Sequence, residues 1–163
     1  MVTDLAPVDL LLQRSGRLQR HERTGRPIGA EPVLHIRWPG EPEAALPEFD
    51  VASTYVYDEH ILLRTWQALR SRGAIGIPED IQGLVDLVYR EDEGLPKVAG
   101  DALATMWQET WRSMQRKKEE EQRDAKNQTV RTPVGSVAHP SDFQKFWRSR
   151  DYCLRFVIRA SAV

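Results

Sequence analysis

Residues 2–21 have the sequence VTDLAPVDLLLQRSGRLQRH, and this stretch indicates how the chain begins to fold. The segment Val2–Ala6 is short and mostly apolar, which predicts the end of a β-strand. Pro7 suits the first turn of a helix, where its missing N–H costs nothing. The apolar residues of a helix predicted over residues 8–21 are Leu10, Leu11, Leu12 and Leu18. A strand that leads directly into a helix is therefore expected.

The rest of the chain alternates loops with helical patterns and shows no internal repeat. Loops are predicted at residues 22–32 and 38–50, which are rich in Gly and Pro, on either side of a strand at Val33–Arg37. Further helices are expected at about 58–71, from Ile77–Asp80 onward, at about 98–125 and at 142–149, and a strand at 152–159. The pattern predicts a mostly α fold with a few short strands.

Length and composition exclude several classes of protein. The chain has 163 residues, a single cysteine (Cys153) and a formal net charge of -1. One cysteine cannot form an internal disulfide, and no apolar run is long enough for a membrane span. The N-terminus has no signal-peptide pattern, so a soluble cytoplasmic protein is expected. The near-neutral charge argues against a wholly basic nucleic-acid binder.

The charge is unevenly distributed along the chain. Residues 1–40 contain six Arg and no Lys, whereas residues 41–63 contain six acids and no Lys or Arg. Arg is suited to bidentate recognition of carboxylates and phosphates, although a GC-rich genome also enriches it.

The candidate site is the group Gln13, Arg17 and Arg20. On a helix these positions are spaced i, i+4, i+7 and share one face. Gly16 is costly inside a helix, by about 1 kcal/mol relative to Ala, which suggests the close approach of another backbone or a ligand. Two guanidiniums and an amide beside a glycine suit a polyphosphate. An exposed Arg-rich helix with an accidental glycine is the open alternative.

The segment Gln13–Arg20 resembles motif VI of superfamily 2 helicases, and Val2–His21 resembles the helicase–nuclease of type I CRISPR–Cas systems. Two later blocks resemble that family in the same order. They are Val56–Asp58 with Leu62–Trp66 and Leu69, and Ile77–Ile81 with Leu84, Val85, Val88 and Tyr89. The long helix through residue 127 also fits.

The resemblance implies a role for each motif residue. In such helicases ATP lies between two RecA-like lobes, and motif VI of the second lobe presents arginines to the phosphates. Arg17 and Arg20 are then the catalytic arginine fingers, and Gln13 joins them in binding ATP near the γ-phosphate. Arg14 is expected in a structural or interlobe ion pair. The implied partners are single-stranded DNA, the CRISPR surveillance complex, the missing helicase lobe and the nuclease domain.

Several parts of such an enzyme are missing from the sequence. It has no G-x-x-x-x-G-K-[ST] loop, no Asp-Glu-x-His box to hold Mg²⁺, no His-Asp nuclease cluster and no metal-ligand spacing. The resemblance therefore implies a C-terminal fragment that is inactive alone. Its expected parts are the remnant of a RecA-like lobe at 1–50, a helical region at 51–128 and a divergent basic tail at 129–163.

Two other interpretations remain open. One is a small stand-alone helical DNA-binding or interaction protein that uses Lys145, Arg148 and Arg150. The other is a fragment of a non-CRISPR superfamily 2 translocase. A truncated lobe also predicts an exposed apolar patch around Leu10, Leu11 and Leu18. The apolar faces that carry Trp66, Trp107 and Trp111 predict core packing rather than base stacking.

Overall fold

The computed structural model describes residues 1–18, 33–41, 43–70, 72–96, 100–127 and 154–161. In chain order the elements of this part are β1 (Val2–Asp4), α1 (Val8–Ser15), β2 (Val33–Arg37), α2 (Val51–Val56), α3 (Glu59–Arg70), β3 (Ala74–Ile77), α4 (Ile81–Tyr89), α5 (Asp101–Asn127) and β4 (Leu154–Ser161). None of these helices is long and apolar enough to cross a membrane. The mostly helical class with a small sheet agrees with the sequence prediction.

The four strands form one sheet in the order β1-β2-β4-β3. The first two strands are parallel, with Val2 opposite His35, and are joined through α1. The last strand of the chain lies in the middle of the sheet, parallel to β2 and antiparallel to β3. A strand near the C-terminus is as predicted, and the sheet depends on it because it joins β3 to the other strands.

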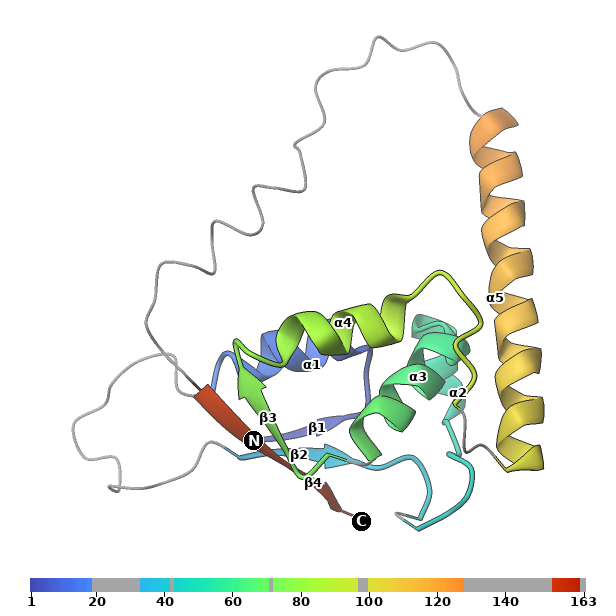
Figure 1. Ribbon diagram of the computed structural model, residues 1–163. Coiled ribbons are helices and arrows are strands. Elements are labelled where there is room, and N and C mark those ends of the chain that lie inside the picture. Colours follow the sequence, from blue (N-terminus) through green and yellow to red (C-terminus); the bar gives the residue numbers. More distant parts are fainter. Residues whose placement is uncertain (19–32, 42, 71, 97–99, 128–153, 162–163) are drawn as a thin grey trace, which may run out of the picture.

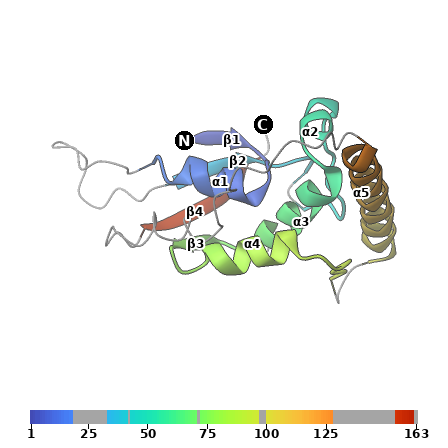
Figure 2. The same cartoon turned by 90° about the horizontal axis from the view of Figure 1, so that it is seen from above.

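The helices α1, α3 and α4 cover one face of the sheet (Figures 1 and 2). The residues of β2 alternate accordingly, since Leu34 and Ile36 are buried whereas Arg37 is exposed. In the described part of the chain no helix lies on the opposite face, where Val2 of β1 is 74% exposed. The described helices therefore cover the sheet on one side only.

The core lies between the sheet and the helices and extends to α5. Its largest fully buried side chain is Trp66 of α3, whose ring centroid is 6.3 Å from that of Trp38. Leu103 and Trp107 of α5 are buried, whereas Trp111 is only partly buried. Core packing is thus confirmed for two of the three helical tryptophans and is partial for the third. Beyond these contacts α5 extends away from the domain as an exposed rod (Figure 1).

Several element boundaries differ from the predictions. The helix predicted over 8–21 ends at Ser15, and residues 16–18 form turns in which Arg17 N–H donates to the Arg14 carbonyl at 3.1 Å. The low helix propensity of Gly16 favours an early end. The short elements α2 and β3 were not predicted, because each has too few residues to show a period. The helix predicted at 142–149 lies outside the described residues.

The predicted exposed patch at Leu10, Leu11 and Leu18 is wrong. Leu11 is only 4% exposed, and the other two leucines pack half-buried against the core. The expectation assumed that a truncated sheet would leave α1 without a partner. The strands, α4 and Leu69 of α3 instead provide that partner, because residues far along the chain return to cover the helix.

Candidate functional site

Helix α1 is held in place by polar contacts at both ends as well as by its buried residues. Arg14 Nη1 donates a hydrogen bond to Thr3 Oγ1 at 2.5 Å, which ties the helix to the preceding strand. The Tyr89 hydroxyl donates to Asp9 Oδ1 at 2.5 Å, which ties it to α4. Partial burial, followed by this hydrogen bond, raises the pKa of Tyr89 above its ordinary range. The outer side of α1 is therefore presented in a fixed orientation. Arg14 has a structural role, although it binds a hydroxyl rather than an acid.

The predicted site residues lie on this outer side as far as the structure describes them. Gln13 and Arg17 are both exposed, one near the end of α1 and the other in the turn that follows. Neither side chain has a hydrogen bond or ion pair to another described residue. Arg20 and His21 lie outside the described residues, as do Lys145, Arg148 and Arg150. Within the described part of the chain, one amide and one guanidinium are thus available to bind an anion.

The predicted close approach at Gly16 is not observed in the described part of the chain. A Cβ at this position would meet only the carbonyl oxygens of Gln13 and Leu12, each at the ordinary distance of 3.6 Å. The φ angle of -59° is helical, so the backbone does not require glycine here. The described residues therefore give no reason for a glycine at this position.

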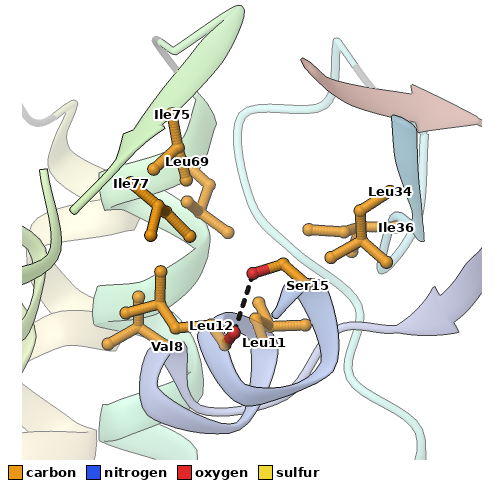
Figure 3. A pocket seen from close by; sticks show the side chains of 9 residues that line it. All are labelled: Val8, Leu11, Leu12, Ser15, Leu34, Ile36, Leu69, Ile75 and Ile77. Carbon is orange, nitrogen blue, oxygen red and sulfur yellow. Dashed lines mark hydrogen bonds between the residues drawn. The ribbon is translucent and has the colours of Figure 1, made fainter. Parts of the chain in front are cut away.

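An apolar cavity of about 20 Å³ lies beneath α1 (Figure 3). Figure 3 shows aliphatic side chains from α1, α3, β2 and β3 converging on it. The one hydroxyl in its lining, that of Ser15, donates to the Leu12 carbonyl at 2.7 Å and is already used. Such a lining offers nothing to a phosphate or a base. The cavity is therefore a packing gap, and the polar surface of α1 lies outside it.

The sequence reasoning missed a second polar cluster, which we call the Arg64 cage. Arg64 of α3 is 3% exposed. Its guanidinium donates to the carbonyl oxygens of Val88 (3.2 Å), Arg90 (2.8 Å) and Glu93 (2.9 Å), and also to that of Asp92. The loop after α4 therefore wraps around one arginine, which satisfies carbonyls that would otherwise lack partners.

The cage continues through His60 into α5. Arg64 Nε donates to His60 Nε2 at 3.0 Å, so the imidazole carries its proton on Nδ1 and is neutral. That nitrogen then donates to Thr110 Oγ1 at 2.9 Å, and the threonine hydroxyl donates to the Met106 carbonyl at 2.9 Å. Burial, followed by the charge of Arg64, lowers the pKa of His60 to about 4. The chain of donors fixes α3 to α5.

Aromatic rings and a glycine complete the cage. The Arg64 guanidinium carbon lies 5.4 Å from the ring centroid of Trp111, and Trp107 Nε1 donates to the Glu93 carbonyl at 2.6 Å. Gly94 has a φ of +57°, and a Cβ there would lie 3.2 Å from Arg64 Nη2. The available sequence signal was a charged residue inside the apolar run of α3, between Leu63 and Thr65. Its partners are mostly backbone carbonyls, which no side-chain pattern reveals.

Among the described residues, no group of three or more His, Cys, Asp or Glu side chains could hold a metal ion. The polar side chains of the two sites described above act as hydrogen-bond donors. Those of the Arg64 cage are used within the chain, whereas Gln13 and Arg17 donate to no other residue that the structure describes.

Comparison with known proteins points to one family. No protein-family model matches the chain. The chain is 32% identical over 126 residues to the CRISPR-associated endonuclease/helicase Cas3 of Thermus thermophilus, covering 77% of this chain and 13% of that protein. It is 40% identical over 92 residues to the CRISPR-associated nuclease/helicase Cas3 of Streptococcus thermophilus, covering 56% of this chain and 9% of that protein.

A solved structure agrees with these relatives. The crystal structure of a CRISPR-associated protein superposes with a TM-score of 0.68 at 44% sequence identity, covering 77% of this chain and 14% of that chain. The chain thus spans only between 9% and 14% of the length of these proteins.

Proposed function

Because the chain is homologous to part of the CRISPR-associated helicase–nuclease Cas3, we propose that it is the C-terminal piece of such an enzyme, from motif VI onward. Residues 1–50 are the end of the second RecA-like lobe in this proposal, residues 51–128 are the helical region that follows, and 129–163 form the tail. In the complete enzyme this piece helps to couple ATP hydrolysis to movement along single-stranded DNA. By itself the chain neither hydrolyses ATP nor cuts DNA.

The uncovered face of the sheet supports the proposal that the chain is a piece of a larger protein. Sheets with parallel strands are normally buried on both faces. Here α1, α3 and α4 cover one face, and no described helix covers the other. Val2 is 74% exposed on β1 and Met1 is 46% exposed beside it. Another part of a larger protein, packed on this second face of the sheet, would bury it.

One observation carries the proposed role of motif VI. Helix α1 is fixed by Arg14 and Tyr89. Gln13 on this helix and Arg17 in the turn that follows it are exposed and have no partner among the described residues. Such donors fit the phosphates of ATP, whose γ-phosphoryl group is the one transferred to water. Arg17 and Arg20 then stabilise the charge that develops on the phosphoryl oxygens, and Gln13 binds beside them. The Mg²⁺ ion is held by parts of the enzyme outside this chain.

The test is a chimera in which this full chain replaces the segment that it matches in the Thermus thermophilus relative. We expect DNA-stimulated ATP hydrolysis by the chimera and none by the chain alone. Arg17→Ala and Arg20→Ala should each lower kcat by roughly 10²-fold or more, since an arginine finger contributes 10³–10⁵ in comparable enzymes.

Arg37→Ala is the matched control. This arginine of β2 is also exposed, but it forms a surface ion pair with Asp4 of β1, away from α1. Its removal should leave ATP hydrolysis unchanged. ATP hydrolysis by the isolated chain that is abolished by Arg17→Ala would show that the chain is not an inactive piece. Full activity of the Arg17→Ala chimera would refute the arginine-finger role.

A further inference from the structure

Helix α2 has an unusual distribution of polar and apolar residues. Its apolar residues Val51, Ala52, Tyr55 and Val56 are all exposed, and they occupy positions i, i+1, i+4 and i+5, which form one stripe along the helix. We call this stripe the α2 patch. The exposed fractions of its three large side chains are 85% for Val51, 91% for Tyr55 and 66% for Val56. No residue of this helix is buried.

The polar residues of α2 are less exposed than its apolar ones. Ser53 and Thr54 are half-buried. Asp50 caps the helix, since Oδ1 accepts from Ser53 N–H and Oδ2 accepts from the Ser53 hydroxyl, both at 2.8 Å. These two bonds lower the pKa of Asp50. A six-residue helix is unstable in water without packing, so a well-capped one with its apolar side in solvent points to a missing partner.

The surroundings of the α2 patch indicate the charge of that partner. Three exposed carboxylates flank the helix along the chain, those of Glu48, Asp50 and Glu59. None of them forms an ion pair with a described residue, and residues 41–63 contain no Lys or Arg. The nearby Asp58 is already paired with Lys117 of α5, at 3.5 Å. A covering surface must therefore bring its own cations.

We propose that the α2 patch is an interdomain docking surface, covered in the complete enzyme by an apolar surface with Lys and Arg at its rim. This surface belongs to the part of the helicase–nuclease that the chain lacks, so the inference rests on the proposed function. The chain spans 13% of the Thermus thermophilus relative, which leaves most of that protein available to supply the partner. Figure 2 shows α2 at the outside of the helical layer, where another domain has access. Apolar contact supplies the affinity, and the charges orient the two surfaces.

Cysteine labelling tests the proposal directly. In a Cys153→Ser background, Tyr55→Cys places a single thiol on the patch at a position that contributes nothing to the core. We expect a maleimide to modify it rapidly in the isolated chain and at least tenfold more slowly in the chimera described above. Glu120→Cys, on the exposed part of α5, is the control and should react at the same rate in both proteins.

A second variant tests the charge of the partner. Glu48→Lys in the chimera should partly restore labelling at position 55, because it places like charges at the rim of the interface. The matched Glu120→Lys should not. Labelling is measured whether or not the chimera hydrolyses ATP, so the two proposals can fail separately.

Equal labelling rates of Tyr55→Cys in the isolated chain and in the chimera would overturn the docking proposal. Protection in the isolated chain that increases with protein concentration would also overturn it, because a second copy of the chain would then be the partner. No effect of Glu48→Lys on a protected thiol would refute the basic rim.

Discussion

Two arginines of the described chain have opposite surroundings. Arg64 on α3 is 3% exposed, and its donors bind four backbone carbonyls and one imidazole. Arg17, just after α1, is exposed and has no partner among the described residues. A guanidinium whose donors are all used within the chain supports the fold. A guanidinium with no partner among the described residues, such as that of Arg17, can bind a ligand. The buried guanidinium of Arg64 cannot, because its donors are already used.

The largest expected effect comes from removing the Arg64 side chain. Arg64→Ala leaves the buried Val88 carbonyl, three partly buried carbonyls and the His60 ring without a donor, so we expect a loss of roughly 3–5 kcal/mol in the free energy of unfolding. Arg17→Ala should change it by less than about 0.5 kcal/mol. Urea unfolding of the full chain measures both. Similar losses in the two variants would mean that the contrast between the arginines is wrong.

Gly94→Ala tests the loop that wraps Arg64. The φ of +57° disfavours any side chain, and the added Cβ would lie 3.1 Å from Asp92 Oδ1. We expect a loss of about 1–3 kcal/mol in unfolding free energy. Gly73→Ala is the matched control, because a Cβ at that position meets nothing within 4 Å. A neutral Gly94→Ala variant would show that the loop is not held in this conformation.

The neutral state of His60 predicts a dependence of stability on pH. Its pKa is lowered from 6.5 to about 4 in the folded chain, so the unfolded chain takes up the proton first as the pH falls. The contribution of this residue is fully present above about pH 6.5 and is lost progressively toward pH 4. Between pH 7 and pH 5, the free energy of unfolding should decrease less in the His60→Gln variant than in the natural chain. Identical decreases would contradict the buried neutral imidazole.

The smallest expected effect is that of Gly16→Ala on stability. The position is helical and open in the described structure, so the free energy of unfolding should stay unchanged or rise by up to about 1 kcal/mol. Urea unfolding measures this, and a marked loss would reveal a close contact that the described residues do not show. A stable variant that weakens ATP hydrolysis in the chimera would assign the need for glycine to the ligand.

The helices α3 and α5 were predicted close to their observed ranges, because hydrophobic periodicity is reliable over several helical turns. The short strands β1 and β2 were also predicted, whereas the short elements α2 and β3 were not. The apolar exposure of α2 was not foreseen, since the helix has only six residues and its apolar stripe faces solvent. The family resemblance, later matched by homologous proteins, came from the order of motifs along the chain and not from any single one.

The candidate site was also only partly predictable. Helical spacing placed Gln13 and Arg17 near each other, and both are exposed in the structure. Their roles toward ATP remain predictions. The role of Arg64 could not be read from the sequence, because its acceptors are carbonyl oxygens 24–29 residues further along the chain. Every residue carries a backbone carbonyl, so a pattern of residue types cannot predict which carbonyls will accept a hydrogen bond.

The sequence by itself determined the helical periods, the absence of Lys and Arg from residues 41–63, and the order of motifs by which the chain resembles a helicase–nuclease. Tertiary structure alone decided that α1 is buried on its apolar side, because residues after position 60 return to cover it. It also decided that one arginine supports the fold while another stays free, because burial and long-range acceptors depend on how distant segments pack. Local sequence encodes which groups can bond, whereas packing decides which of them do.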